Sequence, residues 1–234
     1  MRLLLAGSLR LSLIVDVRTN ILQNVWRETA SRYTEETTLV TRLWEEVERE
    51  YSSTGRHYHT LAHLVYMVEK VNECHGLLDD PDIITFSIFY HDIVYDPARQ
   101  DNEERSTEVA RDRLTRLNVP ADELARCEAQ IVATSDHKGN GDPDTNYLLD
   151  IDLAILGEAP LLYEDYSRKI REEYAIYTDA EYNEGRTNVL RYFLGLERLF
   201  KTDLFYTRYE AQARDNLSSE LRVLERIAKT DSES

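Results

Sequence analysis

Two short segments of this chain concentrate residue types that bind metal ions. In RHYHTLAH, His59 and His63 are four positions apart, so on a helix both side chains would project from the same side, one turn apart. In FYHDIV, His91 and Asp92 end an apolar run, where an uncompensated charge would be costly. Imidazole and carboxylate groups suit zinc, manganese, iron or, less well, magnesium. The two segments therefore indicate a metal site.

A third polar pair, Asp150 and Asp152, lies in the apolar segment DIDLAILG. Carboxylates in apolar surroundings need a cation or hydrogen-bond donors. Each feature alone has an ordinary explanation, because a single buried histidine is usually a hydrogen-bonded core residue and Asp92 could cap a helix or pair with an arginine. The combination and order of the three features favour a shared metal site.

Helices must position these residues, because glycine and proline number only eight and five and divide the chain into helix-sized pieces. Apolar side chains recur at helical spacing over residues 39–47 and 61–68. Residues 83–94 are apolar on nearly all sides, which favours a helix inside a bundle, although a buried strand has the same pattern. Further helices are expected over residues 102–117, from Pro120 to 131, and over 147–156, 161–177, 189–200 and 209–228, with a loop over 135–146. We therefore predict an all-α, single-domain helical bundle.

The composition restricts the partners of the chain. Its net charge of −16 at pH 7 argues against binding a nucleic-acid backbone, which needs a basic face. An anionic phosphorylated substrate would need a bound cation and local arginines to reverse the field inside the site. No uninterrupted run of ~18 apolar residues is present, so no membrane partner is expected. The sequence does not decide between a monomer and a homodimer.

Cysteine usage and the termini indicate the compartment. Cys74 and Cys127 are too few and too isolated for a disulfide framework or a thiolate zinc site, which fits a reduced, cytoplasmic location. The first residues have a basic start and an apolar stretch, but Arg10 interrupts it and no clear small-residue cleavage site follows. We expect an N-terminal extension or leader over residues 1–19, one domain over 20–230 and a tail over 231–234.

The ordered set of a histidine, a later His-Asp pair and a distant aspartate resembles the HD superfamily of metal-dependent phosphohydrolases. The resemblance extends from about residue 20 onward. The segments RHYHTLAHL, FYHDIVYDP, DNEERS, ATSDH, LDIDLAILG, REEY and ARDNL are similar to an uncharacterised family of predicted phosphohydrolases within it. The resemblance implies an HD-type bundle that hydrolyses phosphoester bonds of a nucleotide or other small phosphorylated compound. It also implies a divalent metal ion: Zn, Mn, Fe, Ni, Co or Mg.

The resemblance implies roles for individual residues. The metal ligands would be His63, His91, Asp92 and Asp152. Asp150 is the alternative last ligand, but an Asp-Leu pair ends the ligand set of the cyclic-nucleotide phosphodiesterases that HYHTLAH also resembles, which favours Asp152. By the same similarity His59 would protonate the leaving group, with His137 as a second candidate. Asp92 would be catalytic as well as a ligand, and the metal ion would activate water.

Five polar residues are predicted to bind the substrate or orient the ligands: Arg56, Asp96, Asn102, Glu103 and Arg186. The guanidinium of Arg56 can grip two phosphate oxygens, although an ordinary surface role is equally open. Glu103 has an alternative role as a charge favoured at a helix start.

Two other functions are left open. Some HD proteins hold two irons and activate oxygen, but these use two additional histidines before the final aspartate, and this chain has only His137 there. A noncatalytic binding module would keep the metal for stability alone. The intact ligand set with an adjacent His59 argues against it.

Overall fold

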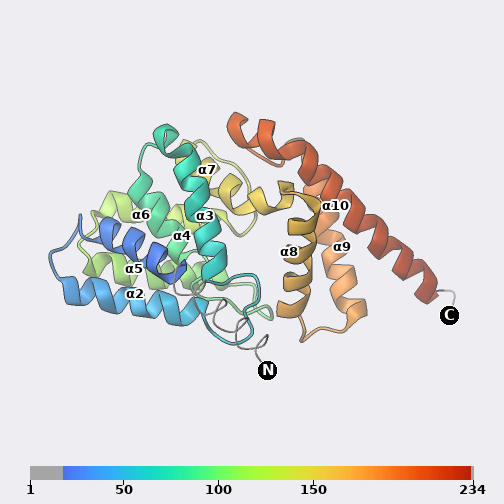
Figure 1. Ribbon diagram of the computed structural model, residues 1–234, viewed down its shortest axis with the longest axis horizontal. Helices are drawn as coiled ribbons and strands as arrows, with labels where there is room; N and C mark the ends of the chain where they lie inside the picture. The colour runs from blue at the N-terminus through green and yellow to red at the C-terminus, as the bar shows by residue number, and fades with distance from the viewer. Residues whose placement is uncertain (1–17, 233–234) are drawn as a thin grey trace, which may run out of the picture. The chain divides into compact units, whose positions relative to one another are not determined.

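A computed structural model describes residues 18–232 of the chain. The regular secondary structure in this range is entirely helical (Figure 1), so the predicted all-α class is confirmed. The chain divides into two compact units between Asp136 and His137, and each is described by itself. The single domain expected over 20–230 stays a prediction. Most of the expected leader, and residues 233–234 of the expected tail, lie outside the described range.

The first unit is built around a buried helix. It contains a helical segment over residues 18–30 and the elements α2 (Thr37–Tyr51), α3 (Leu61–Cys74), η1 (His75–Leu77), α4 (Pro81–Tyr90), α5 (Asn102–Arg116) and α6 (Ala121–Ala133). Helix α4 contacts α3, α5 and α6, and every residue from Ile83 to Tyr90 is buried. The nearly continuous apolar run therefore forms a central helix, as predicted, and not a strand.

Helix α4 begins where capping dictates and ends earlier than expected. The side chain of Asp80 accepts a hydrogen bond from the backbone N–H of Ile83 at 3.3 Å, with Pro81 at the first helical position. The helix ends at Tyr90, so the His-Asp pair lies in the turn that follows. This turn is held by Arg56, which donates to the carbonyls of Asp92 at 2.8 Å and Ile93 at 3.0 Å.

The start of α3 corrects a prediction for the first histidine segment. Thr60 is the N-cap of α3, and its hydroxyl accepts from the N–H of Ala62 at 3.3 Å. A threonine that bonds a first-turn N–H stops the helix from extending further back. His59 therefore precedes the helix, and the expectation that His59 and His63 lie on the same helix is wrong.

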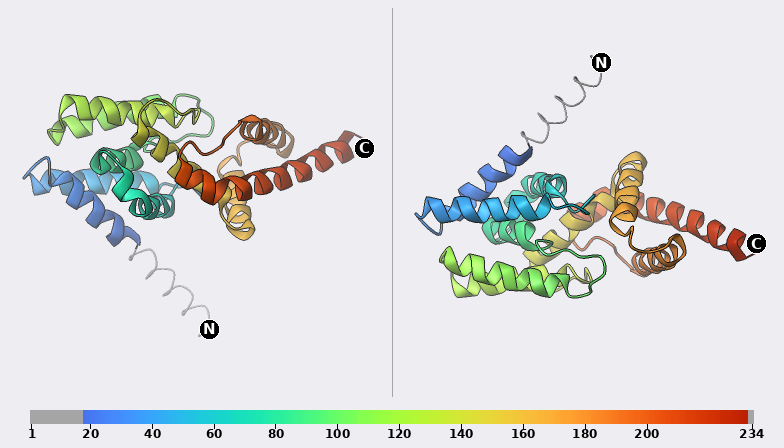
Figure 2. Two further views of the ribbon diagram at one scale, coloured as in Figure 1. Left: turned by 90° about the horizontal axis from the view of Figure 1, so that it is seen from above. Right: turned by 90° about the horizontal axis from the view of Figure 1, so that it is seen from below.

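The second unit contains α7 (Pro143–Leu153), η2 (Ala154–Gly157), α8 (Pro160–Glu173), α9 (Asp179–Gly195) and α10 (Asp203–Ser232). Asp142 caps α7 by accepting from the N–H of Thr145 at 2.9 Å, so the loop expected over 135–146 ends at Asp142. Helix α10 continues past the ends of α8 and α9 (Figure 2). A Cβ at Gly157 would lie 2.6 Å from the carbonyl oxygen of Tyr209, so the close approach of η2 to α10 requires glycine.

Helix α9 begins ten residues before the expected position, 179 against 189, because of a capping box. The Thr178 hydroxyl accepts from the backbone N–H of Glu181 at 3.3 Å, and the Glu181 carboxylate accepts from the backbone N–H of Thr178 at 2.9 Å. These two bonds satisfy N–H groups that a helix start leaves open.

Thr178→Ala is expected to lower the free energy of unfolding by about 1 kcal/mol, because it removes one half of this box. Urea denaturation measures the change. Thr207→Ala, at an exposed position of α10, is the matched control and should stay within about 0.5 kcal/mol of the wild type. Equal effects of the two substitutions would contradict the capping role.

Within residues 18–232, no helix has both the length and the apolar character needed to cross a membrane.

Candidate metal centre

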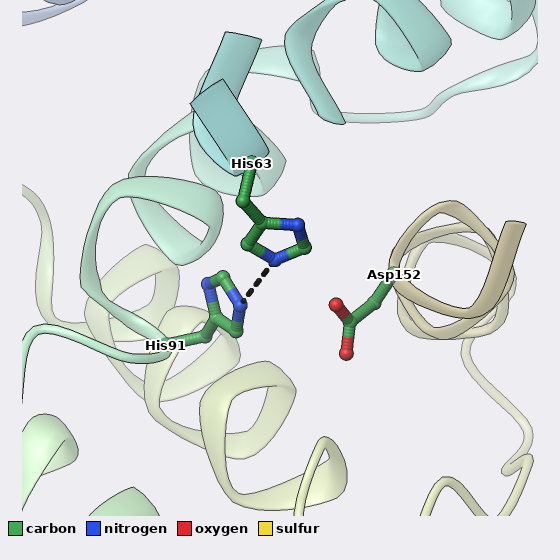
Figure 3. A group of neighbouring side chains, drawn as sticks. All are labelled: His63, His91 and Asp152. Atoms are coloured by element: carbon green, nitrogen blue, oxygen red, sulfur yellow. Dashed lines mark hydrogen bonds between the residues drawn. The ribbon is translucent and has the colours of Figure 1, made fainter. Parts of the chain in front are cut away.

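Two buried imidazoles face each other in the first unit. His63 lies on α3 and His91 in the turn after α4, and they are 3% and 1% exposed. Their Nε2 atoms are 3.4 Å apart, and a dashed line joins the two rings in Figure 3. Two nitrogens that each lie ~2.0–2.1 Å from one tetrahedral cation are roughly 3.3–3.4 Å apart. The observed separation therefore matches that of two ligands of a shared ion.

A backbone carbonyl fixes the tautomer of His91. The Nδ1 atom of His91 lies 2.9 Å from the carbonyl oxygen of Ile88. A carbonyl oxygen only accepts hydrogen bonds, so Nδ1 carries the proton, and a neutral ring presents the lone pair of Nε2 toward His63. Histidines that bind metals are commonly held in this way, with the distal N–H donated to a carbonyl or carboxylate.

Asp92 and His59 adjoin the imidazole pair. Asp92 is 9% exposed, and its Oδ2 atom lies 3.0 Å from Nε2 of His91 and 3.7 Å from Nε2 of His59. The ring centroid of His59 is 5.7 Å from that of His63. The first unit thus brings together four of the residues predicted for the site, although they come from segments about 30 positions apart.

The two aspartates of α7 have different partners in the second unit. Asp150 is fully buried and accepts three hydrogen bonds of 2.7 Å, from the backbone N–H groups of Lys201 and Thr202 and from the Thr202 hydroxyl. It therefore anchors the chain at the start of α10. Burial raises the pKa of Asp150, and these hydrogen bonds oppose that rise.

Asp152 lies two positions further, about 200° around the helix from Asp150. Its Oδ2 atom is 2.9 Å from Nε2 of His137, and its side chain is partly exposed, at 16%. Asp152 is the third side chain labelled in Figure 3. Of the two carboxylates, Asp152 is the one that faces an imidazole, whereas Asp150 is taken up by backbone donors.

Asn102, which is predicted to bind substrate, and the nearby Ser106 hold the backbone that follows the His-Asp turn. The Asn102 side chain accepts from the N–H of Asp96 at 3.1 Å and donates to its carbonyl at 3.0 Å. Ser106 bonds both the N–H and the carbonyl of Val94. Glu103 lies in the first turn of α5. These contacts stabilise the loop between the turn and α5, and the substrate roles of Asp96, Asn102 and Glu103 stay predictions.

Arg186 is part of a buried ion pair in the second unit. It is 7% exposed, and its Nε and Nη2 atoms donate to the two carboxylate oxygens of Glu220 at 2.8 and 3.0 Å. The Tyr163 hydroxyl also donates to Glu220. This pair connects α9 to α10, and the predicted role of Arg186 in substrate binding stays a prediction.

Two tyrosines beside the histidines were not identified from the sequence. The ring centroid of Tyr58 lies 5.0 Å from that of His59 and 4.8 Å from that of His63, and Tyr95 lies 4.3 Å from His59. Their position next to the two histidine segments was the available signal. They give one side of the site an aromatic wall.

No protein-family model matches the chain, and the curated proteins and the solved structures likewise contain no match to it.

Proposed function

We propose that this chain is a cytoplasmic metal-dependent phosphohydrolase of the HD type, in which His63, His91, Asp92 and Asp152 hold a divalent cation. The observation that carries the proposal is the 3.4 Å separation of the two buried Nε2 atoms, together with the carbonyl that fixes the tautomer of His91. Asp92, whose Oδ2 atom lies 3.0 Å from Nε2 of His91, adds a carboxylate beside the imidazole pair.

The donor types fit a divalent cation. His63, His91 and Asp152 each offer one atom of a kind that metals bind, and Asp92 adds a second carboxylate beside His91. Mixed nitrogen and oxygen donors suit zinc, manganese, iron, nickel or cobalt, and magnesium less well. When bound, such a cation supplies Lewis acidity that polarises a phosphoryl oxygen and makes water a better nucleophile.

Asp152 is the better choice for the last ligand. Asp150 already accepts three hydrogen bonds from the residues just before α10, so its removal from these donors would leave two backbone N–H groups without their acceptor. Asp152 is partly exposed, and its carboxylate lies 2.9 Å from Nε2 of His137, which orients it. We propose that Asp152 binds the same cation as the two imidazoles of the first unit.

His59 is assigned the proton transfer to the leaving oxygen. It lies before α3, next to Asp92 and against the ring of Tyr95, so its ring is held beside the ligands without being one of them. An imidazole is well suited to this transfer near neutral pH. The proposed substrate is a nucleotide or another small phosphorylated compound.

Chelation tests the proposal. The purified chain is expected to contain about one divalent ion, and to release phosphate from at least one member of a panel of nucleotides and phosphomonoesters. Removal of the ion should lower turnover by roughly 100-fold or more, since the cation contributes several kcal/mol to transition-state stabilisation. Adding back Zn, Mn, Fe, Ni, Co or Mg one at a time should restore it.

Three outcomes would oppose the proposal. A chain that holds the metal but turns over no member of the panel would be a binding module. Two irons per chain with oxygen consumption would indicate an oxygenase. A chain that retains no metal and hydrolyses nothing would exclude the metal site.

A further inference from the structure

A small cavity lies in the first unit, beside the start of α3. Its volume is about 240 Å³, and its lining includes Arg18, Tyr51, Ser52, Ser53, Arg56 and Thr60. Pockets for drug-sized ligands occupy about 300–1,000 Å³. The room therefore suits a small group, such as an inorganic anion or the terminal group of a larger compound.

The lining of this cavity is cationic. Among the described residues, the lining contains two guanidinium groups and no carboxylate, in a chain that has 44 acidic and 28 basic residues. Several other arginines face a carboxylate, as Arg111 faces Glu128 at 2.7 Å. Among residues 18–232, neither Arg18 nor Arg56 has such a partner. Two cations with no carboxylate partner around one cavity favour an anionic ligand.

Hydrogen bonds to the backbone hold the Arg56 guanidinium in place without a ligand. It donates to the carbonyls of His59, Asp92 and Ile93 at 3.2, 2.8 and 3.0 Å. Its guanidinium carbon lies 4.9 Å from the ring centroid of Tyr51. A rigid cation loses little conformational entropy when it binds an anion. The carbonyls offset its charge only in part, because they are dipoles and not anions.

The remaining donors are hydroxyls and a second, exposed cation. Arg18, Ser52 and Ser53 have exposed side chains that can adjust to a ligand. The Thr60 hydroxyl already caps α3 and donates to the carbonyl of Tyr58. Two guanidinium groups and two hydroxyls match an oxyanion that carries more than one charge and several acceptor oxygens.

We propose that this cavity binds a phosphate group, either free phosphate or the terminal phosphate of a small compound. The site is distinct from the metal ligands and does not depend on the proposed hydrolase activity. Arg56 also holds the carbonyls of Asp92 and Ile93, so an anion on its guanidinium would stabilise the turn that carries His91 and Asp92.

Calorimetric titration of the full chain with inorganic phosphate, and separately with AMP, tests this site. One saturable phosphate site is expected, and Arg18→Gln should weaken it roughly tenfold, because a charge-assisted hydrogen bond is lost. Arg42→Gln is the matched control. It removes the same charge from an exposed position of α2 outside the cavity, and it should change affinity less than twofold. Tighter binding of AMP than of phosphate would identify a terminal phosphate as the ligand, and the reverse would identify the free anion.

Ser53→Ala provides a second variant that keeps the charge, and it should weaken phosphate binding by roughly two- to tenfold. Absence of saturable binding to both probes would overturn the proposal, as would equal losses in Arg18→Gln and Arg42→Gln. Asp152→Asn separates this site from the metal centre. If phosphate binding disappears in Asp152→Asn and persists in Arg18→Gln, the anion binds at the metal and the cavity is not its site.

Discussion

Asp152→Asn is expected to lower the affinity for the divalent cation by at least about 100-fold, with little change in the free energy of unfolding. Substitution of a residue that only hydrogen-bonds a metal ligand already lowers metal affinity about 10- to 100-fold. Loss of a ligand itself should therefore lower the affinity by at least the upper value. The side chain is partly exposed and bonds His137 in a loop, so we expect its substitution to affect the fold less than a buried carboxylate would. Competition titration against a chelator of known affinity measures the change.

Asp150→Asn is the matched control, two positions away on the same helix. An amide at this position keeps one acceptor oxygen and turns an NH2 group toward the backbone donors of Lys201 and Thr202. A buried donor left unsatisfied costs about 1–3 kcal/mol, so urea denaturation should show that loss. The folded fraction should bind metal as the wild type does. If Asp150→Asn loses the metal and Asp152→Asn keeps it, Asp150 is the ligand and the assignment is wrong.

The same titration tests whether the two units share one ion. His91 belongs to the first unit and Asp152 to the second. Metal affinity that falls in both His91→Ala and Asp152→Asn would mean that ligands from both units act on one cation. If metal affinity falls in His91→Ala and not in Asp152→Asn, the metal ligands belong to the first unit.

Helical periodicity predicted the fold class because burial follows the helix repeat. The run around α4 is buried on all sides, as its composition indicated. The ends of helices were less predictable, because caps and not apolar residues decide them. Asp142 and Thr178 start helices before the first apolar positions, and Thr60 excludes His59 from α3.

The contents of the site were predictable by residue type, but its geometry was not. The His-Asp pair and the earlier histidine were identifiable because polar groups in apolar segments need compensation. The 28 positions between His63 and His91 carry no information about distance. The carbonyl of Ile88 and the contacts of Arg56 to the turn involve the backbone, which residue types do not specify.

Residue types also do not specify which distant side chains form ion pairs. Arg186 and Glu220 are 34 positions apart on α9 and α10, and the chain offers many other carboxylates to an arginine. The identity of Glu220 as the ion-pair partner of Arg186 therefore depends on the packing of the helices.

Arg186→Gln is expected to lower the free energy of unfolding by about 3–5 kcal/mol, because it leaves Glu220 buried without its cation. The Glu220 side chain is 12% exposed and also accepts from Ser167 at 3.0 Å. Urea denaturation at pH 7 measures the loss. Arg191→Gln is the control from the same helix. Its pair with Glu225 is exposed, so the loss should stay below about 1 kcal/mol.

The pH dependence of this loss separates the ion pair from a simple packing defect. Burial alone would raise the pKa of Glu220, but the hydrogen bonds and charge of Arg186 outweigh it, and the pKa lies below its ordinary value. The wild type therefore loses this stabilisation as the pH falls below the ordinary range of a glutamate. Without Arg186, burial dominates and raises that pKa, so protonation of Glu220 stabilises the folded variant. The difference between wild type and Arg186→Gln should narrow between pH 7 and pH 5. A constant difference would contradict the ion-pair role, and unchanged stability with a raised KM would instead favour the predicted contact of Arg186 with substrate.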